Sequence, residues 1–359
     1  MIISNISLYQ YRIALNPNLP VASQRIDHRR GLVLSMAVED SALDLVKSAD
    51  VEVSPLSGLD IEGNQLVGFS LESLQQVTDY LIEQLPLLFQ QPLSALITLA
   101  NQCVLPSAAF GLSLLYYKLT GDFNTNSASR CITNSKVPLV YIPNLSDDMT
   151  EAELIDSVSS QLALHDENIN FIKVKVGQFA TKLEIALIYG ILALRPNIRL
   201  RLDANRHFTL DDAINFAACL PKDNIDYIEE PCINPNDNMA FYKALGIHYA
   251  LDETLNDPHF VFEATEGLLA VVIKPMLCGS LDKLANFIKT AESHGVRSIL
   301  SSALESSLGI SDLSILAGQL TPDYAPGLDT LTSFTQDLLV IRSEKPCLTT
   351  VDLPRLLQI

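Results

Sequence analysis

The feature that most limits the fold of this chain is an alternation of short β-branched runs with stretches of helical period, which begins near Pro138. Seven runs have the pattern of strands, at 139–142, 171–176, 198–203, 227–229, 249–252, 271–274 and 298–301. Helical patterns occur among them at 181–194, 210–220, 237–245, 281–294 and 308–320. This order predicts parallel βαβ units, because a helix carries the chain from the end of one parallel strand to the start of the next.

Seven such strands favour a barrel, and a poorly formed eighth strand is expected around 324–328. A doubly wound open sheet is the alternative, but the chain has no G-x-G-x-x-G after a strand and no G-x-x-x-x-G-K-[ST]. The N-terminal part lacks the alternation and predicts a separate α+β unit. Its patterns are strand-like at 2–8 and 32–37, turn-rich at 54–58 and helical at 71–88 and 108–119.

Charge and composition exclude several classes of partner. The 359 residues include 24 Lys and Arg against 42 Asp and Glu, a net charge of −18, which argues against binding to nucleic acid or to an anionic membrane. A small anionic substrate stays open, because a local cation or a few lysines can override the global field. No apolar stretch reaches the ~18 residues of a membrane span, and the first residues lack the features of a signal peptide. Six cysteines without C-x-x-C spacing predict reduced thiols in a cytosolic protein.

Ionisable residues stand at the ends of five successive predicted strands. They are Lys173 and Lys175, then Asp203, Glu229, Asp252 and Lys274. From Lys175 onward the intervals are 22–28 residues, about one βα unit each. Because the carboxyl ends of parallel strands open onto one mouth of a barrel, we expect these side chains to converge there.

Both lysines of the first pair are expected to point into the barrel, because they are two residues apart and Ile172 and Val174 suit the outer face. Buried ammonium groups are costly without negative partners. The three carboxylates supply them, and would repel one another unless a cation binds. All-oxygen ligation without His or Cys suits a hard cation, of which Mg²⁺ is the commonest. Glu230 and Glu253 should point away by strand alternation.

Lys175 and Lys274 are expected on opposite sides of this cation. The cation and one ammonium would stabilise an enediolate while the other amine moves a proton. A free lysine has a pKa of ~10.4, and Lys173 and a divalent cation would both disfavour its charged form, which makes Lys175 a candidate base. Four serines, Ser301, Ser302, Ser306 and Ser307, form a polar turn without a partner histidine and are interpreted as anion binders or helix caps.

These residues resemble the enolase superfamily in its muconate-lactonising branch, and further runs resemble the o-succinylbenzoate synthase family. The matching runs are at 53–58, 106–111, 201–206, 229–232, 273–275, 301–309 and 326–330. The resemblance implies an α/β fold, a (β/α)7β TIM-like barrel with an α+β capping domain formed from the N-terminal region and the C-terminal tail. The implied units are a capping domain at 1–105, a barrel at 106–325 and a returning segment at 326–359.

The resemblance also implies a lyase of menaquinone biosynthesis that uses Mg²⁺, with Mn²⁺ as the alternative. The ion would be held by Asp203, Glu229 and Asp252. Lys175 would remove the α-proton of a cyclohexadiene carboxylate and then, as its ammonium, help to expel the hydroxyl group. Lys274 would stabilise the enediolate through its charge.

Supporting roles are implied by the same resemblance. Lys173 would tune Lys175 and touch the substrate carboxylate, while Arg201 and Asn205 would order the metal ligands. Two segments of the capping domain depart from the family pattern, an insert at 40–50 and an expected mobile loop at 21–30. The contacts of that domain with the succinyl tail of the substrate are therefore left open.

Two other functions are compatible with these residues. An N-acylamino acid racemase or dipeptide epimerase on the same scaffold would use the same two lysines, although the region after Ser301 lacks the Asp-x-Asp that is usual in dipeptide epimerases. A non-catalytic barrel that binds a metal or a small acid is the reading from a different class. The sequence indicates no oligomeric state.

Overall fold

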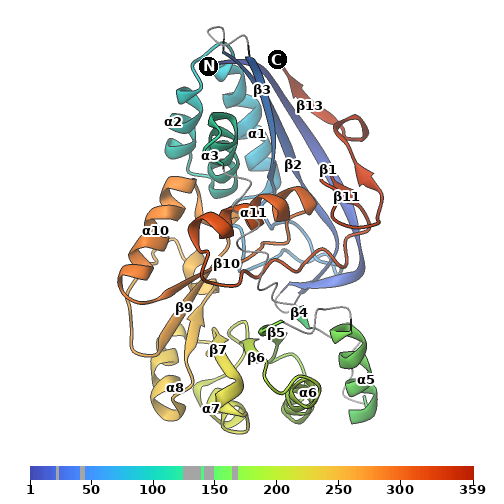
Figure 1. Cartoon of the computed structure of the whole chain (residues 1–359), viewed down its shortest axis with the longest axis vertical. Coiled ribbons are helices and arrows are strands. Elements are labelled where there is room, and N and C mark those ends of the chain that lie inside the picture. Colours follow the sequence, from blue (N-terminus) through green and yellow to red (C-terminus); the bar gives the residue numbers. More distant parts are fainter. Residues whose placement is uncertain (22–23, 41–44, 124–138, 141–148, 164–168) are drawn as a thin grey trace.

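The computed structural model describes residues 1–21, 24–40, 45–123, 139–140, 149–163 and 169–359. Figure 1 shows an antiparallel sheet with helices on one side, set above a curled parallel sheet that carries helices on its outside. Both chain ends lie at the far end of the antiparallel sheet. The sheet at the top is the capping domain, and the curled sheet below it forms the barrel part of an α/β fold.

The capping sheet has the strand order β13-β1-β2-β3. Its strands are β1 (Ile2–Val21), β2 (Gln24–Asp40), β3 (Leu45–Val53) and β13 (Arg355–Gln358), and each pair of neighbours is antiparallel. β13 pairs with β1 from Ser7↔Gln358 onward, so the C-terminal segment returns to the N-terminal sheet. The expected α+β character of this part is confirmed.

The long hairpin of β1 and β2 corrects one expectation. Residues 24–30, expected in a mobile loop, continue β2 and pair with β1 as far as Val21↔Gln24. The reason is burial, because Ile26 and Arg29 are both 3% exposed and tie the strand to the interior. In the expected insert, residues 45–50 belong to β3, and residues 41–44 lie outside the described part of the chain.

Helices cover one face of the capping sheet. They are α1 (Leu74–Gln84), the 3-10 turn η1 (Leu85–Leu88), α2 (Ser94–Gln102) and α3 (Pro106–Thr120). Ser73 and Gln76 form a capping box at the start of α1, and Gly121, with φ 89°, ends α3 in the left-handed conformation. Val77 and Leu81 of α1 join Leu34 of β2 in the largest buried apolar cluster.

The parallel sheet has the order β10-β9-β8-β7-β6-β5-β4. Its strands are β4 (Leu139–Val140), β5 (Phe171–Lys175), β6 (Arg199–Asp203), β7 (Ile225–Glu229), β8 (Tyr249–Leu251), β9 (Leu268–Ile273) and β10 (Arg297–Leu300). The expected eighth strand is reduced to one parallel bridge, Ser301↔Gly327. Within the described residues the barrel is therefore a curled sheet of seven strands that this bridge extends.

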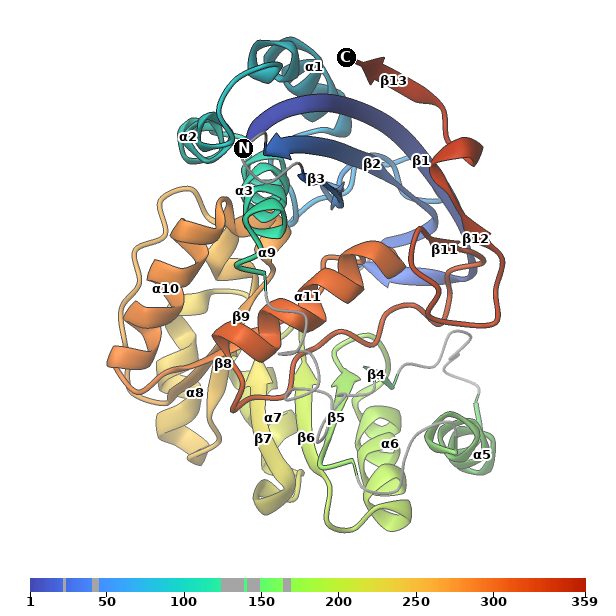
Figure 2. The same cartoon turned by 45° about the horizontal axis from the view of Figure 1, so that its top comes forward.

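Most of the expected helices are found close to their predicted bounds. The helices of this half are α5 (Glu151–Leu162), α6 (Thr181–Leu194), α7 (Leu210–Ala218), α8 (Asn238–Leu245), α9 (Pro275–Cys278), α10 (Leu281–Ser293) and α11 (Ser307–Leu320). The described residues also contain the short elements η3 (Lys222–Asn224), η4 (Pro235–Asp237), η5 (Glu253–Asn256), β11 (Asp337–Leu338), β12 (Cys347–Leu348) and η6 (Thr350–Asp352). Figure 2 shows α11 lying between the capping sheet and the parallel strands, and it contacts β3.

Strand alternation separates the two faces of the parallel sheet. Ile172 and Val174 of β5 pack into an apolar cluster with residues of α5 and α6, as expected for the outer face. Tyr227, Val272 and Ile299 form a smaller cluster on the inner face. No helix in the part of the chain that the structure describes is both long enough and apolar enough to cross a bilayer.

Candidate active site

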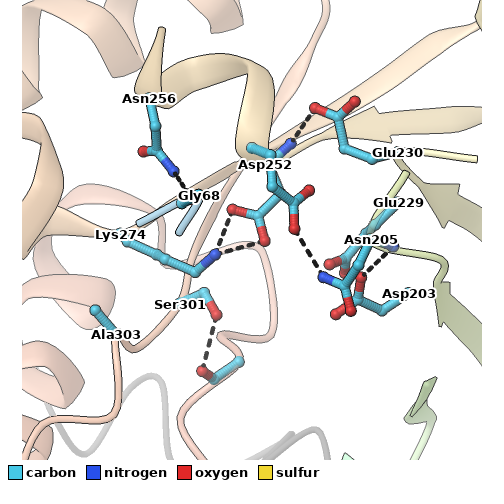
Figure 3. Close-up of polar contacts among 12 residues, drawn as sticks. Gly68, Asp203, Asn205, Glu229, Glu230, Asp252, Asn256, Lys274, Ser301 and Ala303 are labelled. Carbon is cyan, nitrogen blue, oxygen red and sulfur yellow. Dashed lines mark hydrogen bonds and ion pairs between the residues drawn. The ribbon is translucent and has the colours of Figure 1, made fainter. Parts of the chain in front are cut away.

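The ends of the parallel strands bring the predicted site residues together. Lys175 pairs in register with Asp203, and Asp203 pairs with Glu229 on the next strand. Asp252 follows β8, and Lys274 follows β9 directly. Figure 3 shows Asp203, Glu229 and Asp252 gathered beside Lys274. The predicted convergence on one mouth of the parallel sheet is therefore what the structure contains.

Lys173 lies between two of the carboxylates. Its Nζ is 2.5 Å from Oε2 of Glu229 and 3.0 Å from Oδ2 of Asp203. Although burial lowers the pKa of Lys173, the charges of Asp203, Glu229 and Asp252 raise it well above the usual value. Burial, together with the charges of Asp203 and Asp252, raises the pKa of Glu229 to about 7. Burial also opposes ionisation of Asp203, but Lys173 and Lys175 hold its pKa at about 2.

Lys274 forms an ion pair with the third carboxylate, that of Asp252. Its Nζ donates hydrogen bonds to both oxygens of Asp252, at 2.6 Å to Oδ2. Although burial lowers the pKa of Lys274, Asp252 and Glu253 raise it, so this lysine is held as an ammonium. The ring of Phe69, on the loop after β3, lies 5.8 Å from the same Nζ. The capping domain thus reaches the mouth of the barrel at Lys274.

Lys175 differs from the other two lysines. Burial and the charges of Lys173 and Lys274 lower its pKa, against opposing contributions from Asp203 and Glu253. Its Nζ donates to Oδ1 of Asn205 at 3.3 Å. A lowered pKa makes the neutral amine more accessible, which suits this lysine to accept a proton.

Asn205 connects this lysine to two carboxylates. Its backbone N–H donates to Oδ1 of Asp203 at 3.2 Å, and its Nδ2 donates to Oε1 of Glu253 at 2.7 Å. The expectation that Glu253 points away is wrong, because the chain leaves β8 at Leu251 and turns into η5, where strand alternation no longer applies. Burial and the charges of Asp252 and Asp203 raise the pKa of Glu253 to about 7. The sequence signal that could have identified Glu253 as a site residue was its position next to Asp252 at the end of a strand.

Glu230 does point away from the mouth, as expected. Its Oε1 accepts the backbone N–H of Asp252 at 3.0 Å and that of Thr254 at 2.8 Å, and its Oε2 accepts from Nε of Arg206 at 3.3 Å. Glu230 therefore fixes the backbone that carries Asp252. Figure 3 shows its contact with the Asp252 amide.

Arg201 lies elsewhere than the resemblance implied. Its Nε donates to Oδ2 of Asp226 at 3.2 Å and its Nη1 to the carbonyl of Ala325 at 2.8 Å, while its guanidinium stacks 4.5 Å from the ring of Phe171. The cause is a register shift between β6 and β7, from Leu200↔Ile225 to Arg201↔Tyr227, which leaves Asp226 unpaired in the ladder and able to meet Arg201. In the described contacts Arg201 supports the barrel below the site and does not bind the three carboxylates.

Ser301 and Ser302 follow β10 at the mouth, and both are buried. Ser301 Oγ donates to the carbonyl of Gly327 at 3.2 Å. Ser302 Oγ lies 3.0 Å from Oγ1 of Thr330 and accepts the N–H of Leu304 at 3.2 Å. Both hydroxyl groups thus help to shape the loop after β10, and their role as anion binders stays a prediction.

Comparison with known proteins identifies the family to which the chain belongs. Residues 157–329 match the family described as Enolase C-terminal domain-like. An o-succinylbenzoate synthase from Salmonella arizonae is 34% identical over 98% of both chains, and one from Aliivibrio fischeri (strain MJ11) is 32% identical over 92% of this chain and 91% of the relative. The chain belongs to the o-succinylbenzoate synthase family. It is therefore a lyase of the enolase superfamily, and the predicted resemblance is confirmed.

Solved structures agree with this placement at the level of the fold. The o-succinylbenzoate synthase from Thermosynechococcus elongatus BP-1, complexed with Mg in its active site, has a TM-score of 0.67 and 22% identity, with 97% of both chains covered. The L-Ala-D/L-Glu epimerase from Bacillus subtilis has a TM-score of 0.71 and 18% identity, with 94% of this chain and 92% of that chain covered. The predicted capped barrel fold of the synthase family is confirmed.

The carboxylates of this member of the synthase family do not form a ready-made metal cluster. In the part of the chain that the structure describes, no three His, Cys, Asp or Glu side chains are arranged to hold an ion. The reason lies in the lysine contacts, because Lys173 and Lys274 occupy oxygens of all three predicted ligands. Both ammonium groups thus lie within ion-pair distance of the three predicted ligands.

Proposed function

We propose that this chain is a Mg²⁺-dependent enzyme that converts 2-succinyl-6-hydroxy-2,4-cyclohexadiene-1-carboxylate into 2-succinylbenzoate by syn-dehydration, a step of menaquinone biosynthesis. Family membership supports the reaction. The observation that carries the proposal is the contrast between Lys175, whose pKa is lowered, and Lys274, whose pKa is raised, at the two ends of one row of buried carboxylates. One lysine is suited to take a proton and the other to stabilise negative charge.

The oxygen donors gathered at the mouth suit a divalent cation by their chemistry. Asp203, Glu229 and Asp252 are each at most 3% exposed, and burial, with the charges of Asp203 and Asp252, raises the pKa of Glu229. Their hard oxygen donors suit Mg²⁺, with Mn²⁺ as an alternative. When bound, the ion would supply positive charge for the carboxylate of the substrate and for the charge that develops on it.

The lysines carry the proton chemistry. Lys175 takes the proton from the ring carbon that bears the carboxylate, breaking that C–H bond, and becomes an ammonium. The ammonium then returns this proton to the hydroxyl group on the neighbouring ring carbon as the C–O bond breaks. The products are the aromatic ring and water, so no oxidant or reductant is needed. One residue that serves as base and then as acid acts on one face of the ring, which accounts for a syn elimination.

The other polar residues act on position and charge. Lys274, held as an ammonium, stabilises the electron pair that the deprotonated ring carries before the hydroxyl group leaves. Lys173 lowers the pKa of Lys175 through its charge. Asn205 fixes Lys175 relative to Asp203, while Ser301 and Ser302 form a wall of the mouth.

Turnover of the cyclohexadiene acid tests this proposal directly. The wild-type protein with Mg²⁺ should form the absorbing aromatic product, and Lys175→Ala should lower kcat by about 10²- to 10⁴-fold. Mg²⁺ binding by that variant, measured by calorimetry, should be unchanged. A folded wild-type protein without measurable turnover would remove the assignment.

Racemisation is the second activity to test, because epimerases share the fold. Two lysines at opposite ends of the site could also exchange the α-proton of an N-acylamino acid. Incubation of N-succinyl amino acids in D₂O would detect such exchange by mass. Efficient racemisation without dehydration would replace the proposed reaction with the alternative.

A further inference from the structure

A buried carboxylate joins the capping sheet to the barrel outside the row of site residues. Glu52 lies on β3 and is 1% exposed. From the capping sheet it accepts hydrogen bonds from the hydroxyl groups of Tyr11 and Ser54. From the barrel it accepts the N–H of Ser306 at 3.0 Å, the hydroxyl group of Ser306, and the N–H of Gly309 at 3.0 Å. One side chain thus binds donors from both parts of the molecule.

The barrel donors belong to the first turn of α11. Ser306 is the residue before this helix, and its own side chain makes no cap hydrogen bond. Glu52 therefore caps α11 from the other domain, with its negative charge at the positive end of the helix dipole.

Two glycines leave the space that this arrangement needs. A Cβ atom at Gly309 would lie 2.7 Å from Oε2 of Glu52. A Cβ atom at Gly31 would lie 2.6 Å from both the ring of Tyr11 and Cβ of Ser54, the two capping-sheet donors. The backbone on both sides is thus shaped around the carboxylate.

The segment held by this contact is the loop after β10, residues 301–305, which we call the β10 loop. Leu304 has a φ of 62°, which is strained for a side chain of this kind. Arg29 of β2 donates from Nε to the carbonyl of Leu304 at 2.9 Å, and also binds the carbonyls of Ser54 and Pro55. Strained conformations persist where their surroundings fix them. Here the two residues that fix the segment, Arg29 and Glu52, both come from the capping domain.

The β10 loop borders the proposed active site. Figure 3 shows Ser301 and Ala303 beside Lys274, on the wall of the mouth. A shift of α11 would move this wall relative to the lysine. The contact at Glu52 is therefore placed to set the shape of the substrate pocket from outside it.

We propose that Glu52 is a positioning residue for the proposed reaction: by capping α11 from the capping sheet, it fixes the β10 loop against Lys274 and so sets how tightly the substrate is held. The proposal rests on the proposed function for its kinetic consequence, but its structural part stands alone. Glu52 does not touch the reacting atoms, and acts through Ser306 and the loop before it.

The variant Glu52→Gln tests the proposal. An amide replaces one accepting oxygen with an NH₂ group, which faces the donors on one side of the carboxylate. Hydrogen exchange of the amides at 303–306, measured by mass spectrometry, should become at least about tenfold faster. KM should rise about tenfold with a smaller change in kcat, because a displaced wall weakens binding more than proton transfer.

Asp312→Asn is the matched control. Asp312 lies further along α11, accepts from Nζ of Lys118 on α3 at 2.7 and 2.9 Å, and also joins the two parts of the molecule. The same carboxylate-to-amide change there weakens a contact between the parts without touching the β10 loop. It should leave both the exchange at 303–306 and KM unchanged, even where it lowers Tm.

The outcomes separate the possibilities. Faster exchange and a higher KM in Glu52→Gln alone support the proposal. Equal effects in both variants, or faster exchange with an unchanged KM, overturn it, because Glu52 would then only hold the two parts of the molecule together without shaping the substrate pocket. If Glu52→Gln does not fold, Tyr11→Phe removes one donor and should change exchange and KM in the same direction, and no change overturns the proposal. If the wild-type protein has no turnover, the proposed function fails, and the exchange comparison alone decides whether Glu52 holds the loop.

Discussion

Lys173 places its ammonium group 2.5 Å from Oε2 of Glu229, at a carboxylate that we assign to a metal ion. A divalent cation at this carboxylate would add to the positive charge that Lys173 places beside it. We expect Mg²⁺ to raise Tm, since a ligand that binds only the folded state stabilises it by about 2.7 kcal/mol at a hundred times its Kd. Thermal melts at increasing Mg²⁺ measure this, with Ca²⁺ and EDTA for comparison. Glu229→Gln should reduce the rise in Tm that Mg²⁺ causes. A wild-type Tm that does not change with Mg²⁺ would contradict the assigned ligands.

The contact between Asn205 and Lys175 predicts a change in pH dependence. Asn205→Asp adds a negative charge beside the ammonium form of Lys175, which favours that form and raises its pKa. Since the neutral amine is the base, the rising limb of kcat/KM should move to higher pH, by on the order of one pH unit. The control is Asn224→Asp, because Nδ2 of Asn224 binds the carbonyls of Pro196 and Ile198 outside the site. A shift of the limb in both variants would argue against a local effect.

Glu305 predicts a change of stability with pH. Burial, and then the charge of Glu52, raise its pKa to about 7 from a usual value of 4.5. The folded state therefore holds a proton that the unfolded state loses, so stability should fall as the pH rises from about 4.5 to about 7. The contribution is on the order of 3 kcal/mol.

Denaturant unfolding at several pH values measures this contribution as the difference between the wild type and Glu305→Gln. The difference is needed because burial also raises the pKa of Asp312, to about 6. Asp312 therefore adds its own fall of stability with rising pH. Parallel pH curves for the two proteins would show that Glu305 is ionised in the fold.

Two glycines within helices should respond oppositely to alanine. At Gly309 a Cβ atom would lie 2.6 Å from Cβ of Glu305, so Gly309→Ala should destabilise the fold by about 1–3 kcal/mol. At Gly190, in α6, the nearest atom would be Cγ1 of Ile155 at 3.5 Å, an ordinary contact. Gly190→Ala should therefore be stabilising, by up to about 1 kcal/mol, through helix propensity. Unfolding curves of both variants test the pair, and equal loss at both positions would contradict the close contact at Gly309.

The regular parts of the fold could be predicted from the periodicity of the sequence. Alternating strands and helices indicated the parallel sheet, and the spacing of Lys175, Asp203 and Glu229 by one βα unit placed them at one mouth. The residue bounds of the three implied units stay a prediction. The closure of the barrel was harder to predict from the sequence, because the segment near Gly327 forms only one bridge with Ser301.

The rest depends on local departures from regular structure. Arg201 was misplaced because a shift of register beside it brings Asp226 within reach, and such a shift has no signature in the strand pattern. Glu253 was misplaced because a 3-10 turn replaces the strand that alternation assumes. Residues 24–30 of β2 were misjudged because Arg29, polar and loop-like in sequence, is buried by binding backbone carbonyls.

The pairing of β13 with β1 has a consequence for how the molecule is made. β1 is synthesised first, yet one of its edges receives its partner only after every strand of the barrel has been translated. Until then the nascent hairpin presents an unsatisfied row of amide and carbonyl groups, the kind of edge that recruits foreign strands. The yield of native enzyme should therefore depend on what shields this edge during translation.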